Sequence, residues 1–388
     1  MISFVREKGT DMDFEKITAY LDSLPGQGIP GADCIICRDH QVLYRHMVGT
    51  NDRNRIEPVH NSDRYLMFSM TKVQTMTAFM QLVEQGKISL QDEVAKYLPA
   101  YGRLMVKKDG IVEEAKESLK IWQLLSMQSG LNYDLERPGI RRVLNEKGMN
   151  ATTRELVDSF VESPLDFEPG THFQYSLSHD VAAAVIEVVS GMSFGEYLKK
   201  NIWEPLGMNR TSFARPMNDA VENLAQQYIM NEDEEIVQME QSCCYQLSDA
   251  YESGGAGLIS CTEDYAVLAD MIACGGEGKN GARILKPETV ERIKTNLLCE
   301  AGRKDIADSM GRAGYGYGCG MQVLMEPEKI GSTSPAGVFG WDGAAGSCIT
   351  METGTKTSIV YIMHVRNCGF AYGVIHPTLR DMVFGNDK

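Results

Sequence analysis

The amino-acid sequence predicts an α/β fold of the α+β type, in which an antiparallel sheet flanked by helices carries an inserted, mostly helical domain. Strand-like runs lie near both ends of the chain, and helical patterns fill most of its middle. Early and late strands in one chain favour a single sheet that is closed by both chain ends. We expect residues 1–96 and 251–388 to form the sheet domain and residues 97–250 to form the insertion.

The first predicted elements are a helix and a hairpin. Phe14, Ile17 and Leu21 recur at helical spacing, and the pattern ends at Pro25 and Gly26. Two runs with strand-like composition follow at residues 32–37 and 41–48. The polar residues 38–40 between these runs indicate a turn, so we expect a β-hairpin early in the chain.

The middle of the chain is predicted to be mostly helical between residues 97 and 207. A stripe of apolar residues at 76, 79, 80 and 83 indicates a helix that begins near Ser69 and ends at Gly86. Another clear helix covers residues 180–190 and ends at Gly191. A hairpin is expected at residues 223–238, and the glycine-rich runs 253–257 and 314–320 are expected to form tight loops.

The end of the chain returns to strand-like patterns. Residues 345–351 and 357–365 are expected to be strands, with Glu352-Thr353-Gly354 between them, and residues 377–384 form a short predicted helix. These late strands complete the sheet that the early hairpin begins.

The composition excludes several classes of function. With 43% hydrophobic and 23% charged residues, the chain can bury a core, and disorder is not expected. A net charge of −15 argues against a nucleic-acid partner, because phosphate binding needs clustered Lys and Arg. No run approaches the roughly 18 apolar residues of a membrane span, and the first residues lack an export signal. We therefore expect a cytoplasmic protein.

The cysteines are expected to be free thiols. There are ten of them in a chain without an export signal, which indicates a reducing compartment. Cys34 and Cys37 have C-x-x-C spacing, but residues three apart on a strand point to opposite faces of the sheet. We therefore expect neither a metal site nor a cofactor.

The candidate catalytic group begins with the run Phe68-Ser69-Met70-Thr71-Lys72. On a helix, positions i and i+3 share one face, so Lys72 can reach the hydroxyl of Ser69 and accept its proton. The helix N-terminus adds free N–H groups and the positive end of its dipole, and both favour a developing oxyanion.

Two later segments extend this group. Tyr175 lies in a loop before a predicted helix, where its phenol can exchange protons with a lysine. The run Phe339-Gly340-Trp341-Asp342-Gly343-Ala344 opens a late strand, and a strand edge beside a nucleophile can supply a second oxyanion donor.

These elements, in this order and spacing, resemble the serine β-lactamase and penicillin-binding protein superfamily. The resemblance is to its class C-like branch and, within that branch, to the family VIII carboxylesterases. It covers nearly the whole chain and includes residues 122–131, 197–208 and 254–264.

The resemblance implies a role for each matching residue. Ser69 would be the acylated nucleophile, Lys72 its proton acceptor and Tyr175 the second acid/base of the relay. The N–H groups of Ser69 and Ala344 would form the oxyanion hole.

The sequence departs from the β-lactamase pattern at two positions. Leu177 stands where Tyr-x-Asn has its asparagine, and Trp341-Asp342-Gly343 replaces the cationic Lys-Thr-Gly motif that binds the carboxylate of a β-lactam. An aromatic third motif resembles that of the family VIII esterases and suits neutral esters. Asp342 either faces the site, where it would favour an amine-bearing substrate, or is a structural acid within the sheet domain.

The sequence therefore predicts a serine hydrolase of small carboxylic esters, acting on a small-molecule ester or amide without a cofactor. The alternatives are a β-lactamase, a D-alanyl-D-alanine carboxypeptidase or D-amino-acid amidase, and a non-catalytic acyl- or β-lactam-binding protein. Ser193 fits the G-x-S-x-G pattern of another hydrolase class, but a helix precedes it, so we expect it to cap the next helix. His172 and His179 are expected to be loop or surface residues.

Overall fold

A computed structural model describes residues 12–52, 56–213, 221–240 and 246–385. The expected lack of an export signal concerns residues 1–11, which lie outside the described part. A seven-stranded sheet has the order β10-β11-β12-β13-β14-β1-β2, and all its pairings are antiparallel. The first strand of the chain therefore pairs with the last long strand, as the sequence predicts.

The pairing of β1 (Gly31–Arg38) with β14 (Thr357–Met363) joins the two ends of the chain in one open sheet. Both strands are almost wholly buried, and successive side chains point to opposite faces. Ile35 and Cys37 belong to one hydrophobic core, whereas Cys34 and Ile36 belong to another. The sheet therefore separates two layers of packed helices.

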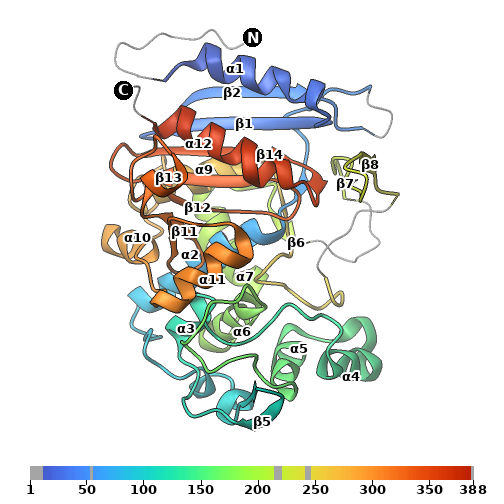
Figure 1. Cartoon of the computed structure of the whole chain (residues 1–388), viewed down its shortest axis with the longest axis vertical. Coiled ribbons are helices and arrows are strands. Elements are labelled where there is room, and N and C mark those ends of the chain that lie inside the picture. The colour runs from blue at the N-terminus through green and yellow to red at the C-terminus, as the bar shows by residue number, and fades with distance from the viewer. Residues whose placement is uncertain (1–11, 53–55, 214–220, 241–245, 386–388) are drawn as a thin grey trace.

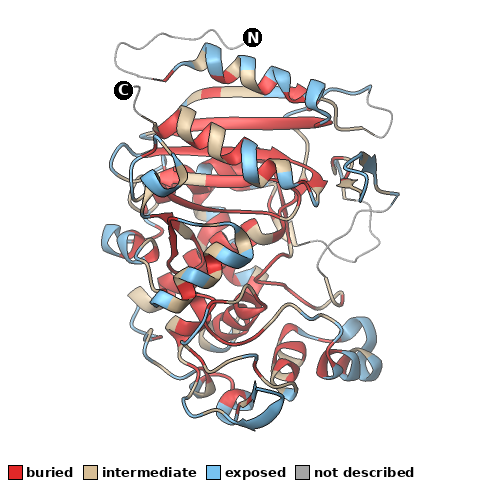
Figure 2. Ribbon diagram, viewed as in Figure 1, coloured by how far each residue is buried: buried red, intermediate tan, exposed pale blue. Residues whose placement is uncertain are grey.

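One layer consists of α1 (Phe14–Ser23) and α12 (His376–Phe384), which contribute to the same core on the outer face. In Figure 1 these helices lie along the sheet near the two termini. The other face packs against α9 (Thr262–Ala273), which contacts β1, β13 and β14. Figure 2 shows that the sheet and the inner helices are predominantly buried.

The inner region is built around two contacting helices, α2 (Thr71–Glu84) and α6 (Ser178–Ser190). Nearly all residues of α2 are buried, and the first nine residues of α6 are also buried. Shorter helices surround them: α3 (Ile121–Leu125), α4 (Pro138–Lys147), α5 (Thr153–Ser159), α7 (Phe194–Leu198) and α8 (Glu204–Leu206). This helical region holds Ser69 and Lys72 against β12 of the sheet.

The remaining strands are short. The large sheet also contains β2 (Gln41–Gly49), β10 (Tyr315–Tyr317), β11 (Gln322–Leu324), β12 (Phe339–Asp342) and β13 (Cys348–Glu352). Smaller sheets are formed by β3 (Tyr65–Leu66), β6 (Ser212–Phe213), β7 (Tyr228–Met230), β8 (Ile236–Gln238), β9 (Leu258–Ser260) and β15 (Val365–Arg366). Helices α10 (Pro287–Ile293) and α11 (Glu300–Met310) precede β10.

The structure corrects three expectations from the sequence. The segment expected to be mostly helical contains a hairpin, β4 (Met105–Lys108) with β5 (Ile111–Glu114). The glycine-rich run expected to be a loop contains β10. The strand expected from residue 345 begins at Cys348, because residues 343–346 form a turn in which the Gly346 N–H donates to the Gly343 carbonyl at 2.9 Å.

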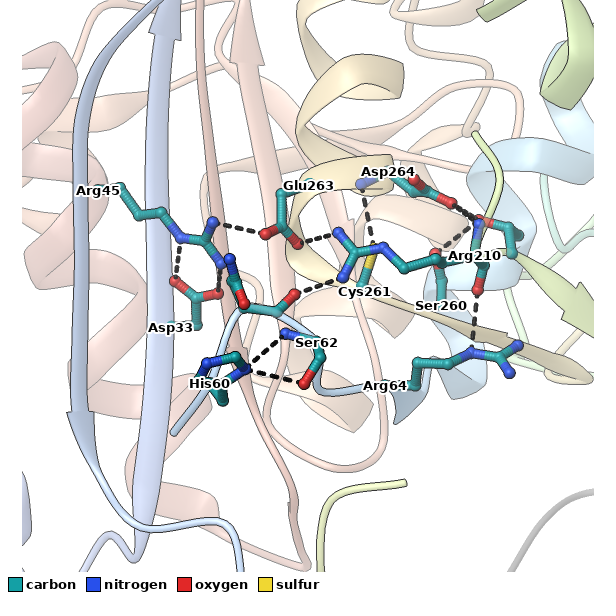
Figure 3. A network of polar contacts seen from close by, with 12 residues as sticks. Asp33, Arg45, His60, Ser62, Arg64, Arg210, Ser260, Cys261, Glu263 and Asp264 are labelled. Carbon is teal, nitrogen blue, oxygen red and sulfur yellow. Dashed lines mark hydrogen bonds and ion pairs between the residues drawn. The ribbon is translucent and has the colours of Figure 1, made fainter. Parts of the chain in front are cut away.

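A polar network joins the N-terminal hairpin to α9 (Figure 3). Arg45 on β2 pairs with Asp33 on β1 at 2.7 Å and with Glu263 in the first turn of α9 at 2.5 Å. Arg210 pairs with Glu263 from the other side at 2.7 Å. Because Asp33 is only 2% exposed, its charge depends on this pairing for stabilisation.

No single helix of the described residues is long and apolar enough to cross a membrane. One bent pair, Ser178–Ser190 with Phe194–Leu206, meets the length and composition criteria only when both helices are taken together, and the two are inclined by 75°. The described cysteines are free, and Cys34 and Cys37 are both buried.

Candidate active site

Ser69 lies at the junction between β3 and α2. It is the middle residue of a 3-10 turn, Phe68–Met70, which leads directly into α2. Phe68 has a φ of 47°, a left-handed conformation that a bulky residue rarely adopts. The segment before the turn is fixed to β9, because the Met67 N–H donates to the Leu258 carbonyl at 2.9 Å. This backbone presents a half-exposed Ser69 above a wholly buried helix.

Lys72 lies directly beneath Ser69. Its Nζ is 3.3 Å from the Ser69 Oγ and donates to the Gly255 carbonyl at 2.8 Å. The side chain is 0% exposed. Burial lowers the pKa of Lys72 to about 7, although the negative charges of Asp180 and Asp342 act in the opposite direction. A substantial fraction of this lysine is therefore neutral near neutral pH and able to accept a proton.

Tyr175 stands beside the same pair. Its phenol accepts a hydrogen bond from the Trp341 Nε1 at 3.0 Å and lies close enough to Ser69 for the serine hydroxyl to influence its pKa. The Lys72 Nζ lies 4.6 Å from the centre of the Tyr175 ring. Burial raises the pKa of Tyr175 far above its ordinary value, and the polar groups of Ser69 and Trp341 only partly oppose this effect. The phenol therefore keeps its proton at neutral pH and can donate it.

Tyr133 is a second phenol at the site, and the sequence reasoning missed it. Its hydroxyl is 3.4 Å from the Lys72 Nζ, and its ring stacks on that of Tyr175 with centroids 5.7 Å apart. It follows the Ser-Gly-Leu segment by two residues, but a lone tyrosine in a loop has no spacing that indicates catalysis. Only the fold brings it to Lys72.

The third segment places backbone donors near Ser69. Gly343 lies so close to the nucleophile segment that a Cβ at this position would be 2.5 Å from the Met67 carbonyl oxygen. Ala344 follows in the turn and is half-exposed. In the described turns and loops, no backbone hydrogen bond uses the N–H of Ser69 or of Ala344. Both groups can therefore donate to a developing oxyanion.

Asp342 and Leu177 are both buried. The Asp342 carboxylate pairs with the Arg312 guanidinium, and the two side chains are 12% and 11% exposed. This ion pair favours the interpretation of Asp342 as a structural acid. The sequence left open whether Asp342 faces the site or is a structural acid, and it did not indicate Arg312 as its partner. Leu177 is 2% exposed and stands at the N-cap of α6.

Three residues that were not expected to be catalytic have other roles. The Ser193 side chain caps α7 by accepting a hydrogen bond from the Glu196 N–H at 3.2 Å, as predicted. His172 is an exposed residue that pairs with Asp305 at 2.9 Å. His179, expected in a loop or on the surface, is instead wholly buried in α6, because its helix packs against α2. Burial lowers the pKa of His179, and the nearby Lys72 lowers it further.

Within the described residues, one group has the ligand types and spacing that could hold a metal ion: Asp39, His40 and Cys274, with ligand atoms within 4.8 Å of one another. It lies on the β1–β2 turn and at the end of α9. Lys356 already pairs with Asp39 at 2.8 Å, and the His40 Nδ1 lies 2.7 Å from the Asp270 Oδ2. The Asp39 carboxylate and the His40 ring therefore already have protein partners.

Comparisons with known proteins concern the family and the fold of the chain. A family model described as Beta-lactamase matches residues 14–368. Esterase EstB of Burkholderia gladioli is 26% identical over 403 residues, with 96% of each chain covered.

Solved structures are also similar. EstCE1, described as a hydrolase with promiscuous acyltransferase activity, has a TM-score of 0.78 at 24% identity and covers 96% of this chain and 98% of its own. Simvastatin synthase (LovD) from Aspergillus terreus has a TM-score of 0.76 at 18% identity, covering 97% and 98%. At these identities, the structural likenesses establish the fold and nothing beyond it.

Proposed function

Because the chain belongs to the beta-lactamase family, we propose that it hydrolyses small carboxylic esters through an acyl-enzyme on Ser69. The observation that carries the proposal is the distance of 3.3 Å between the Oγ of a half-exposed serine and the Nζ of a wholly buried lysine. The similarity to Esterase EstB supports the choice of an ester among the substrates of the family.

Acylation begins with proton transfer from Ser69 to neutral Lys72. The serine oxygen attacks the ester carbonyl carbon, and the carbonyl oxygen becomes an oxyanion between the N–H groups of Ser69 and Ala344. These donors have fixed positions, so they stabilise the charge without reorganisation at the moment of reaction.

Collapse of the tetrahedral intermediate breaks the bond to the leaving alcohol, which needs a proton. Tyr175 supplies it, since its raised pKa keeps the phenol protonated. The protonated Lys72 then returns a proton to Tyr175, and Tyr133, at 3.4 Å from the Lys72 Nζ, provides a second phenol along this route. A water molecule deacylates Ser69 by the same steps in reverse and yields the free acid.

The surroundings of Ser69 favour a neutral substrate. Leu177 offers no amide for an acylamino side chain, and Trp341 places an indole where carboxylate-binding relatives carry a lysine. Asp342 and Arg312 neutralise each other. An uncharged ester therefore meets no unpaired charge at the third motif.

The proposal is tested by turnover of a short-chain p-nitrophenyl ester and of a chromogenic cephalosporin. Wild type is compared with Ser69→Ala and with the matched control Ser193→Ala, which removes a helix-capping serine. We expect ester cleavage in wild type and in the control, none in Ser69→Ala, and little cephalosporin cleavage. Ester activity that survives in Ser69→Ala would exclude the proposed nucleophile. A stable acyl group on Ser69 without turnover would indicate a binding protein.

A further inference from the structure

A carboxylate that the catalytic scheme does not use is buried behind Lys72. Asp180, near the start of α6, is 0% exposed. Its Oδ1 accepts hydrogen bonds from the Tyr251 hydroxyl at 2.6 Å, from the Ser253 hydroxyl at 2.6 Å and from the Gly255 N–H at 3.4 Å. All these donors lie between residues 251 and 255, so one oxygen atom fixes a whole segment to α6.

The second oxygen of Asp180 has a different environment. In the described part of the chain, Oδ2 is buried and has no hydrogen-bond partner. It lies against Gly255, where a Cβ would be only 2.6 Å from Oδ2 and 3.2 Å from the Tyr133 hydroxyl. Gly254 packs just as tightly, since a Cβ there would be 2.3 Å from the His179 carbonyl oxygen. Two glycines are therefore needed for this segment to reach the carboxylate.

The segment that Asp180 fixes is also the one that holds Lys72. The Gly255 N–H donates to Asp180, and the Gly255 carbonyl accepts from the Lys72 Nζ at 2.8 Å. We propose that Asp180 is a positioning residue for acylation: it fixes residues 253–255 so that Gly255 orients Lys72. Its negative charge also favours the protonated form of Lys72. This inference rests on the function proposed above.

The other groups that face Lys72 leave this role to Asp180. Asp342 on β12 is the other carboxylate that acts on Lys72, and its charge is offset by Arg312. Tyr133 and Tyr175 face Lys72 from two loops, and Tyr175 stays protonated at neutral pH because burial raises its pKa. His179 on α6 is kept neutral by burial, which lowers its pKa. Removing the negative charge of Asp180 should therefore change the proton affinity of Lys72 most directly.

The first test is the pH dependence of kcat/KM for Asp180→Asn. The amide keeps an oxygen for Tyr251 and Ser253 and places its NH₂ where Oδ2 has no partner, so mainly the charge is removed. We expect the acid limb to move to lower pH by about half to one unit, because an opposite charge no longer favours the protonated lysine. KM should stay unchanged. Asp33→Asn, the same substitution at another buried aspartate, should leave the limb in place.

Asp180→Ala tests the positioning role. Without the carboxyl group, residues 253–255 lose their anchor, and we expect kcat to fall about 100-fold at its optimal pH, more than in Asp180→Asn. An unmoved acid limb in Asp180→Asn, together with equal kcat values for the two variants, would overturn the inference.

A double-mutant cycle tests the same inference without activity. Unfolding free energies are measured for wild type, Asp180→Asn, Lys72→Met and the double variant at pH 6 and pH 9. We expect a stabilising coupling at pH 6, where Lys72 is charged, and almost none at pH 9, where it is neutral. Coupling that is absent at both pH values would overturn the inference even if the protein were inactive, whereas an inactive wild type with intact coupling would count against the proposed function alone.

Discussion

A single buried lysine determines the chemistry available at this site. An ammonium group removed from water is costly to keep charged, and the two carboxylates near Lys72 only partly offset that cost. The Lys72 pKa of about 7 therefore places the transition between acid and base in the range where a hydrolase operates.

The first prediction concerns the pH dependence of ester turnover. In the proposed scheme neutral Lys72 is the active form, so kcat/KM should rise as the pH increases through about 7 and then level off. Lys72→Met should lower kcat/KM by about 1,000-fold, since it removes a general base. Lys72→Arg is the informative control: it keeps a cation that cannot release its proton, and it should be equally inactive. A rate limb that survives in Lys72→Arg would assign the titration to another group.

The second prediction separates the two phenols. Tyr175 contacts Ser69 and Trp341, whereas Tyr133 contacts Lys72 at 3.4 Å. We expect Tyr175→Phe to reduce kcat about 100-fold and Tyr133→Phe to reduce it less, because in the proposed scheme only Tyr175 delivers the proton to the leaving group. Pre-steady-state acylation with esters of different leaving-group pKa provides the measurement. If Tyr133→Phe were the more damaging, the two roles would be reversed.

At the scale of elements, the junction between the N-terminal hairpin and α9 depends on Arg45. This arginine is 16% exposed and pairs with a buried aspartate and a partly exposed glutamate (Figure 3). Burial raises the pKa of Asp33, whereas the pairing with Arg45 opposes that effect. The hairpin is therefore held to α9 by charge as well as by apolar contact.

The third prediction tests that junction. Arg45→Met should lower the free energy of unfolding by about 3 kcal/mol, because it leaves Asp33 buried without its partner. Arg103→Met removes an ion pair whose side chains are 76% and 58% exposed, and it should cost no more than about 1 kcal/mol. Urea unfolding of both variants at pH 7 gives the comparison. Equal losses would show that burial does not decide the contribution of these pairs.

The elements that the sequence predicted best are those with strong periodicity. The first hairpin and the helices at residues 14–23 and 178–190 follow apolar spacing, and the structure confirms them. The hairpin at residues 105–114 was missed although Asp109-Gly110 is a turn signal, and both residues have positive φ values of 49° and 83°. The prediction missed this hairpin because the segments around it have helical patterns, whereas the turn signal covers only two residues. The division into residues 1–96 with 251–388 and residues 97–250 stays a prediction.

At the scale of the whole molecule, the sequence indicated the proposed catalytic residues but not the contacts that hold them in place. Ser69 and Lys72 are three residues apart, so a local pattern reveals them. Lys72 and Gly255 are 183 residues apart, and Tyr251 and Asp180 are 71 apart. No local pattern encodes contacts of this kind, because they exist only after distant segments have packed together.

The fourth prediction is that the molecule loses stability in mild acid. His364 is 3% exposed, and burial lowers its pKa from 6.5 to about 4. In the unfolded chain His364 therefore binds a proton below about pH 6.5, whereas in the folded chain it stays neutral until about pH 4. His364 alone should remove about 3 kcal/mol of stability across that window as the pH falls. The buried His179 and His376, whose pKa values are also lowered, add losses of the same sign.

Urea unfolding at pH 7.5, 6 and 5 measures this effect. His364→Gln should flatten the dependence on pH, even though it weakens contacts at pH 7.5. His60→Gln, at an exposed position, should leave the dependence as in wild type. An unchanged slope in His364→Gln would mean that other groups cause the acid sensitivity.

The closure of the sheet by both chain ends also affects how the protein is made. Arg38 and its cross-strand partner Thr357 are 319 residues apart. A ribosome adding about 5 to 20 residues per second takes roughly 15 to 60 seconds between them. During that interval one edge of β1 has no neighbouring strand, and such edges readily pair with other chains. A chaperone would therefore have to shield this strand edge for longer than in a chain whose neighbouring strands are consecutive.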